Sequence, residues 1–339
     1  MLPGTSLIGE LADVDPRAIP QELLQSGKPV VLRGLVSHWP MVQAGRGSAE
    51  DAVAYLRGFE RADAPPVVAT VGPPEIGGRF FYNDDMSGFN FRQEQVPLGV
   101  ALKTLLKYAQ EEVSPAIYIG STTIDTWLPG FRASNDLSIP GADALASIWI
   151  GNRTRIAAHQ DVPDNLACVV AGRRRVTLFP PDQLPNLYIG PLDHTPAGQP
   201  ISLVDFAAPD HERFPRFAQA QAHALTAVLE PGDAVLIPSL WWHHMEALEA
   251  FNVLVNYWWR QTPAWMDTPM NALMLAIMTV RDLPAEQRAN WEDVFRHYVF
   301  QPGEATADHI PESARRVLAP LDETQARSLR ARLLQRLNR

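Results

Sequence analysis

The sequence predicts a mainly β protein with helical additions. Between residues 117 and 259, short runs rich in apolar and β-branched residues alternate with glycine, proline, asparagine and aspartate. Many short strands separated by turn signals are typical of a sandwich or barrel rather than of alternating strands and helices. The expected strands are residues 116–119, 147–150, 165–171, 176–179, 234–237 and 253–258.

The N-terminal region, residues 1–110, mixes strands and helices, and we expect it to pack on this core. Ser48 is followed three residues later by Asp51, which is a pattern that begins a helix. A second helix is expected from Pro97 to Tyr108, because proline is favoured in a first turn and leucines recur at spacings of three and four. Residues 111–262 would form the β core.

The C-terminal region, residues 263–339, is predicted to be helical, and residues 270–280 are nearly all apolar. A last helix beginning at Asp322 places three leucines on one stripe: Leu329, Leu333 and Leu337. Such a surface must be covered, either by the core of the same chain or by a second chain across a two-fold axis. We expect a homodimer formed through these helices.

Composition places the chain among ordinary globular proteins, with 46% hydrophobic and 20% charged residues. A formal net charge of −9 disfavours a basic surface that would bind the phosphate backbone of nucleic acid, so nucleic acid is not an expected partner. No stretch approaches the roughly 18 uncharged apolar residues of a membrane span, and no leader pattern opens the chain. We therefore expect a soluble cytoplasmic protein without membrane contact. Its single cysteine, Cys168, lies in an apolar run and is expected in the core.

A candidate metal site is formed by His159 and Asp161 together with a distant histidine in the segment Trp241-Trp242-His243-His244. In an extended chain, residues two apart point to the same side, so His159 and Asp161 can face one ion. Two imidazoles and one carboxylate on one face of an octahedron leave positions open, as in non-haem Fe(II) oxygenases. By itself this pair of residues is weak evidence, because short motifs often match by chance.

The metal motif lies within a longer series of motifs in a fixed order. They are His159-Gln160-Asp161, Gly172-Arg173-Arg174-Arg175, Leu178-Phe179-Pro180-Pro181-Asp182-Gln183, Val204-Asp205-Phe206, Glu212-Arg213-Phe214-Pro215, Pro231-Gly232-Asp233, Trp241-Trp242-His243-His244-Met245-Glu246 and Asn256-Tyr257-Trp258. With this series, the stretch from about Ser147 to Trp259 resembles the cupin-like JmjC branch of the 2-oxoglutarate oxygenases. It is particularly similar to the asparaginyl hydroxylases that act on hypoxia-inducible factor.

The resemblance implies a double-stranded β-helix, or jelly-roll, core of the cupin type. It also implies that His159, Asp161 and His243 are the iron ligands, and His244 should point away from the metal because side chains alternate along a strand. Fe(II) and 2-oxoglutarate are the implied cofactors. O₂ would oxidise 2-oxoglutarate to succinate and CO₂ while a substrate C–H bond is hydroxylated.

Further site residues follow from the same resemblance. Asn165 and Asn256 are expected near the cosubstrate or metal, and Tyr118 is expected to donate its hydroxyl to the distal carboxylate of 2-oxoglutarate. The chain departs from many relatives at two positions: Ile156 replaces a threonine that bonds the cosubstrate, and Arg174 replaces a lysine.

The position of Arg174 can also be argued from strand geometry. Gly172 offers a turn, after which Arg174, Val176 and Leu178 share one apolar and inward face. An arginine there needs an anion, because an unpaired buried charge is very costly. It could pair with a structural carboxylate or extend to the rim, or it could clamp the distal carboxylate of 2-oxoglutarate, with Arg155 as the next candidate.

The expected function is hydroxylation of a protein or peptide side chain. The same chemistry on a small metabolite or a tRNA base is the first alternative. A cupin that binds a ligand without turnover is another, and a Zn or Mn cupin with isomerase or hydrolase activity is a third. The sequence does not identify the substrate.

Overall fold

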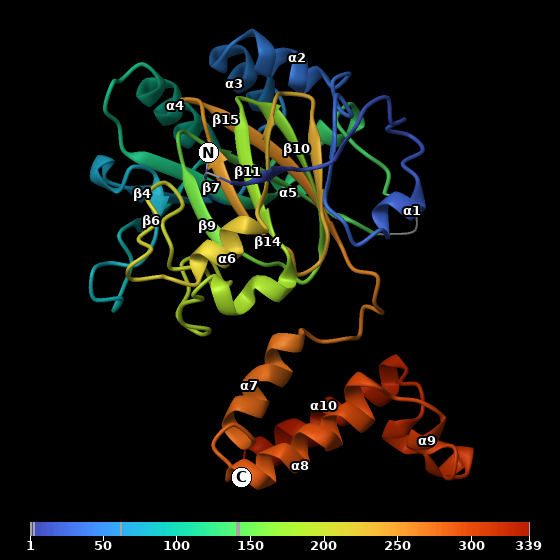
Figure 1. The fold of residues 1–339 in the computed structure, drawn as a ribbon. Coiled ribbons are helices and arrows are strands. Elements are labelled where there is room, and N and C mark those ends of the chain that lie inside the picture. Colours follow the sequence, from blue (N-terminus) through green and yellow to red (C-terminus); the bar gives the residue numbers. More distant parts are fainter. Residues whose placement is uncertain (1, 3, 62, 140–142, 339) are drawn as a thin grey trace. The chain divides into compact units, whose positions relative to one another are not determined.

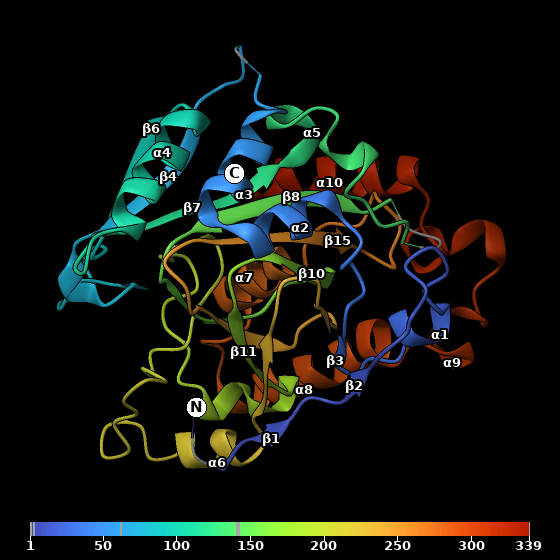
Figure 2. The same ribbon diagram turned by 90° about the horizontal axis from the view of Figure 1, so that it is seen from above.

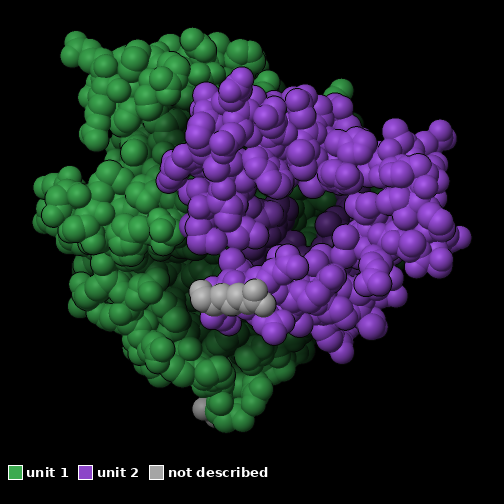
Figure 3. Space-filling view, turned by 90° about the horizontal axis from the view of Figure 1, so that it is seen from below, with its two compact units in different colours: residues 1–260 green, residues 261–339 purple. Residues whose placement is uncertain are grey.

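The computed structural model describes all residues except 1, 3, 62, 140–142 and 339. The chain divides into two compact units, Met1–Arg260 and Gln261–Arg339, which are coloured separately in Figure 3. The N-terminal region and the β core belong to the same unit, because the N-terminal strands join the sheets of the core. Within the described residues, no helix is long and apolar enough to cross a membrane.

Two sheets form the first unit (Figure 1). The nine-stranded sheet has the order β2 (Glu10–Leu11), β3 (Val30–Leu32), β13 (Ala234–Ile237), β10 (Asp164–Ala171), β15 (Asn252–Trp259), β8 (Leu145–Gly151), β7 (Ala116–Thr123), β4 (Val67–Gly72) and β6 (Arg92–Val96). The six-stranded sheet has the order β1 (Ser6–Leu7), β12 (Leu225–Leu229), β11 (Arg174–Phe179), β14 (Trp242–Ala247), β9 (Arg155–His159) and β5 (Arg79–Phe80).

Side chains from both sheets meet in a shared apolar layer. Val169 of β10 and Leu254 of β15 pack in one cluster with Val176 of β11 and Met245 of β14. Every residue of β10 is buried, as expected for a central strand covered on both faces. The mainly β fold with a jelly-roll core is confirmed.

Helices cover the outer face of the nine-stranded sheet, and Figure 2 shows three of them along it: α2 (Pro40–Gly47), α3 (Ala49–Arg57) and α4 (Leu98–Ala109). The Oγ of Ser48 accepts a hydrogen bond from the backbone N–H of Asp51 (3.0 Å), so the predicted helix start is confirmed. Pro97 caps α4 rather than forming its first residue. α2 lies very close to β10, because a Cβ on Gly45 would come within 2.2 Å of the Val170 carbonyl oxygen.

Shorter helices complete the first unit. They are α1 (Gln21–Leu24), η1 (Pro74–Ile76), α5 (Ile124–Trp127), η2 (Phe131–Ala133), η3 (Pro181–Asn186) and α6 (Phe217–Ala222). Phe217 of α6 packs with Phe179 and Trp242, which belong to strands β11 and β14. The insert between the two halves of the metal motif therefore covers part of the six-stranded sheet.

The second unit is helical, as predicted. It contains α7 (Pro269–Thr279), α8 (Ala285–Phe295), a π-helical turn η4 (Arg296–Phe300), α9 (Glu304–Ala307), η5 (Glu312–Ala314), η6 (Arg316–Leu318) and α10 (Glu323–Leu337). Asp322 and Gln325 cap α10 reciprocally. No residue of α7, α8 or α10 is buried, and large apolar side chains stay exposed: Leu273, Met278, Trp291, Val294, Leu333, Leu334 and Leu337.

These exposed apolar side chains lead to our first prediction, that the chain is a homodimer through its C-terminal helices. The double variant Leu333→Glu and Leu337→Glu should be monomeric, because charges on a dimer interface are costly to desolvate. Light scattering at micromolar concentration measures the mass. Gln335→Glu, an exposed change on the same helix, is the control and should remain a dimer. A parent protein with the mass of a monomer would contradict the prediction.

Candidate metal and cosubstrate site

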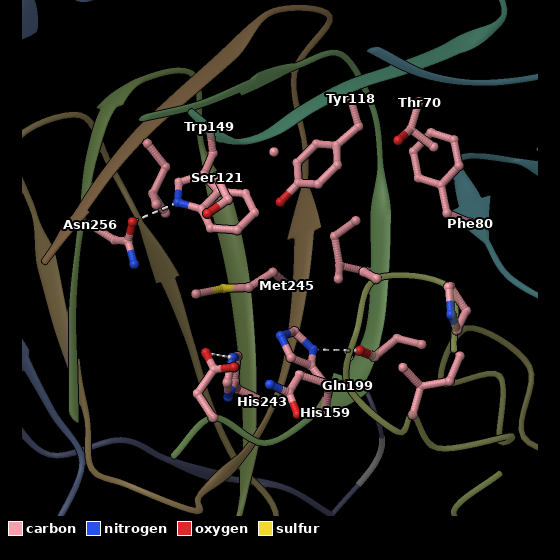
Figure 4. A pocket seen from close by; sticks show the side chains of 18 of the residues that line it. Thr70, Phe80, Tyr118, Ser121, Trp149, His159, Gln199, His243, Met245 and Asn256 are labelled. Carbon is pink, nitrogen blue, oxygen red and sulfur yellow. Dashed lines mark hydrogen bonds and ion pairs between the residues drawn. The ribbon is translucent and has the colours of Figure 1, made fainter. Parts of the chain in front are cut away.

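A cavity of about 340 Å³ lies between the two sheets of the first unit (Figure 4). Strands β9, β11 and β14 supply residues from one side, and β4, β7, β8, β10 and β15 supply residues from the other. The structure brings together in this cavity all seven site residues expected from the sequence: His159, Asp161, His243, Arg174, Asn165, Tyr118 and Asn256.

Two neighbouring strands position the three candidate metal ligands. His159 ends β9 and lies directly opposite His243 of β14, and the centres of the two rings are 4.2 Å apart. Asp161 follows β9, where its backbone carbonyl accepts a hydrogen bond from Leu240 (2.9 Å). One possible ligand atom from each of the three side chains lies within 4.8 Å of the other two.

The hydrogen bonds of both histidines leave one nitrogen free for a metal. Nδ1 of His159 lies 3.0 Å from the Ala157 carbonyl, and Nδ1 of His243 lies 3.0 Å from the Trp241 carbonyl. A carbonyl only accepts hydrogen bonds, so in the neutral form of each ring Nδ1 carries the proton and Nε2 keeps its lone pair. Backbone partners of this kind fix the orientation of metal-binding imidazoles.

The carboxylate completes a set of atoms that fits a divalent cation. Oδ2 of Asp161 is buried without a hydrogen-bond partner among the described residues, and it lies 3.5 Å from Nε2 of His243. Burial raises the pKa of Asp161, but His243 and His159 together hold it below its usual value. Burial, followed by the nearby His243, lowers the pKa of His159 to about 4. An ionised carboxylate beside a neutral imidazole is the form that binds metal.

Arg174 of β11 provides a buried cation in the same cavity. Its side chain is only 2% exposed, and Nε and Nη2 have no hydrogen-bond partner among the described residues. Burial lowers its pKa, although the hydroxyl of Tyr118 opposes this shift. A guanidinium group in such a position requires an anion, and its planar fork suits a carboxylate.

A chain of hydrogen bonds orients the amides on the opposite wall. The indole N–H of Trp149 donates to Oδ1 of Asn256 (2.6 Å), and Nδ2 of Asn256 donates to Oδ1 of Asn165 (3.2 Å). The ring of Trp149 also stacks on Tyr118, with 5.8 Å between the centres. Burial raises the pKa of Tyr118, so its hydroxyl remains a proton donor. Trp149 was not predicted as a site residue, because its role depends on the pairing of β8 with β15.

Other candidates lie outside the cavity. Arg155 is on the opposite face of β9, where Nη1 pairs with Asp205 (3.0 Å), so it does not provide an alternative to Arg174. His244 also points away from the metal ligands, as predicted, and its ring lies 5.0 Å from that of Phe206. Burial, followed by Arg155, lowers the pKa of His244 to about 3. Ile156 lines the cavity and contributes no hydroxyl group there.

Comparison with known proteins agrees with this fold and site. A family model described as a cupin-like domain matches residues 16–264, so the chain belongs to this family. The family resemblance expected from the sequence is thereby confirmed.

Curated relatives carry several activities in their names. The chain is 25% identical to lysine-specific demethylase 8 of Xenopus tropicalis over 68% of its own length and 48% of that protein. It is 38% identical to tRNA wybutosine-synthesizing protein 5 of Danio rerio over 31% of this chain and 29% of that protein. It is 25% identical to the human bifunctional peptidase and (3S)-lysyl hydroxylase JMJD7 over 68% of this chain and 77% of that protein. The chain thus spans less than half of the length of the first two of these relatives.

The geometry predicts that His243 binds metal and that its neighbour His244 does not. His243→Ala removes one of three metal ligands. It should therefore weaken Mn(II) binding by more than roughly 10- to 100-fold, which is the loss typical when a residue that only hydrogen-bonds to a ligand is replaced. His244→Ala is the matched control and should retain stoichiometric metal. Metal content after dialysis against Mn(II) measures both. Metal lost from His244→Ala but kept by His243→Ala would reverse the assignment.

Proposed function

We propose that this chain is an Fe(II)- and 2-oxoglutarate-dependent oxygenase that hydroxylates a C–H bond in a protein or peptide side chain. The observation that carries the proposal is that one cavity contains both three converging ligand atoms and a buried guanidinium group, which has no anionic partner among the described residues. A molecule with a chelating 2-oxo acid at one end and a carboxylate at the other satisfies both.

Each residue then has a defined task. His159, Asp161 and His243 would hold the metal and would leave coordination positions for the cosubstrate and O₂. Arg174 and the Tyr118 hydroxyl donate hydrogen bonds to the distal carboxylate. When bound, iron and 2-oxoglutarate supply the oxidising chemistry with O₂, and succinate and CO₂ are released.

Apolar side chains and hydrogen bonds in the walls surround and orient the polar groups of the cavity. Trp149, Met245 and Leu254 line the cavity with apolar surface, which strengthens the charge interactions inside it. The amides of Asn165 and Asn256 are held in one orientation by the hydrogen bond from Trp149. The polar groups that would contact the cosubstrate are therefore already oriented before it binds, which lowers the entropic cost of binding.

A protein side chain is the favoured substrate for two reasons. Two of the relatives above are named for reactions on lysine, which supports a protein substrate for this chain. The net charge of −9 disfavours a tRNA substrate. A small metabolite is the second candidate, because the cavity volume of about 340 Å³ lies in the range of small-molecule sites.

Oxygen incorporation distinguishes the two substrate classes. The Fe(II)-loaded protein is incubated with a cell lysate, 2-oxoglutarate and ¹⁸O₂, and peptides and small molecules are analysed separately by mass spectrometry. The proposal expects peptides that gain one ¹⁸O atom, and Asp161→Ala as the control should give none. Label confined to small molecules would favour the second candidate. Absence of both label and succinate would contradict the oxygenase assignment.

Arg174→Ala should raise the KM for 2-oxoglutarate by at least about tenfold, because a hydrogen bond to a charged group contributes roughly 1.5–3 kcal/mol. Mn(II) affinity should be unchanged, since Arg174 is not a metal ligand. Arg173→Ala is the matched control: its side chain is 48% exposed and pairs with Glu249 outside the cavity. An unchanged KM in a folded Arg174→Ala variant would show that Arg174 has a structural role.

Trp149→Phe removes the hydrogen bond to Asn256 and keeps an aromatic ring beside Tyr118. The loss of one neutral hydrogen bond, about 0.5–1.5 kcal/mol, should weaken 2-oxoglutarate binding roughly two- to tenfold. Calorimetry on the Mn(II)-loaded protein measures this without turnover. The control is Trp241→Phe, whose indole N–H donates to the Gly27 carbonyl away from the cavity (3.2 Å). Equal affinities in the two variants would show that the amide orientation does not depend on Trp149.

A further inference from the structure

A second cavity, of about 240 Å³, lies on the other face of the strands that carry the metal ligands. Its floor consists of residues that alternate with those of the first site. Arg175 follows Arg174 on β11, His244 follows His243 on β14, and Arg155 lies on β9. Phe206 and Pro209 of the insert form a wall.

The charged side chains that line this second cavity are two arginines, Arg155 and Arg175, and one carboxylate, Glu246. Glu246 of β14 lies opposite both Arg175 and Arg155 in the strand pairing, and it accepts a hydrogen bond from Nη1 of Arg175 (2.5 Å). Arg155 pairs with Asp205, whose second carboxylate oxygen lies 3.9 Å from Nη1 of Arg79. Arg79 and Asp205 do not line the cavity, but with them included three guanidinium groups share two carboxylates. This local excess contrasts with the net charge of −9 of the whole chain.

A further observation indicates that the hydrogen-bonding capacity of Arg175 is not fully satisfied by the protein. Nε of Arg175 is buried and has no hydrogen-bond partner among the described residues. Buried donors of this kind normally have an acceptor.

We propose that the second cavity binds a small oxyanion, a phosphate or carboxylate group, between Arg175, Arg155 and His244. Guanidinium groups bind such oxygens through paired, charge-assisted hydrogen bonds. The volume of the cavity is much larger than a single water molecule needs, so a phosphate or carboxylate group can enter it. An anion held there would link β11, β14 and β9 behind the metal site. This inference does not depend on the oxygenase activity.

The test is a calorimetric titration of the full chain with inorganic phosphate, and separately with succinate, in chloride buffer at constant ionic strength. Saturable binding with one site per chain is expected for at least one of the two, and the tighter ligand identifies the source of the oxyanion. Arg175→Gln should weaken this binding at least tenfold. Glu246→Gln should tighten it, because Glu246 competes for Arg175 and adds a repulsive charge.

Two controls locate the bound anion. Arg174→Ala should retain the binding, which separates this cavity from the candidate 2-oxoglutarate site, and Arg173→Gln, an exposed neighbour, should leave it unchanged. Circular dichroism checks the fold of each variant. If Arg175→Gln does not fold, the opposite change expected for Glu246→Gln still tests the proposal. Absence of saturable binding by both anions, loss in Arg174→Ala, or weaker binding in Glu246→Gln would overturn it.

Discussion

The guanidinium group of Arg174, buried between two sheets, is the constraint around which the candidate site is organised. Its side chain is 2% exposed, and two of its nitrogens have no partner among the described residues. Burying a charged group without a partner in a protein interior normally costs several kcal/mol, on the order of the desolvation penalty of one ion. The same cavity also contains the three metal-ligand candidates, and the proposed anionic cosubstrate would supply the missing partner of Arg174.

The alternation of side chains along β9, β11 and β14 allows one sheet to serve two different environments. The faces that point inward carry Arg174, His159 and His243, whereas the outer faces carry Arg175, Arg155 and His244. Adjacent residues on one strand therefore have different partners. Burial and His243 lower the pKa of His159, and burial and Arg155 lower the pKa of His244. Both histidines are neutral near pH 7, but only one of them faces a carboxylate that could share a metal.

The sequence predicted the parts of this arrangement that depend on local pattern. Strand alternation placed Arg174 with Val176 and Leu178 on an inward face, and alternation also separated His243 from His244. Helix caps at Ser48 and Asp322 were correctly located because their signals lie within four residues. The family resemblance then related the distant His243 to His159, which local pattern alone could not do.

Features that depend on pairing between distant strands could not be predicted. Arg155 lies four residues before His159, so a regular strand would place both on one face. The pairing of His243 with His159 and of Met245 with Ile156 leaves one extra residue in β9, and this bulge accompanies the outward position of Arg155. Similarly, Trp149 reaches Asn256 only through the register of β8 against β15. The second cavity also needs the insert to close it, which no local motif indicates.

The central claim is that one cavity holds a metal and 2-oxoglutarate together, and calorimetry tests it directly. The full chain is titrated with 2-oxoglutarate under anaerobic conditions, first without metal and then after loading with Mn(II), which uses the same ligands as Fe(II) without turnover. The account predicts one site per chain that is lost in Arg174→Ala and whose affinity for 2-oxoglutarate rises at least about tenfold, or 1.4 kcal/mol, when the metal is present. Equal affinity with and without Mn(II) would contradict it, because 2-oxoglutarate would then not share its site with the metal.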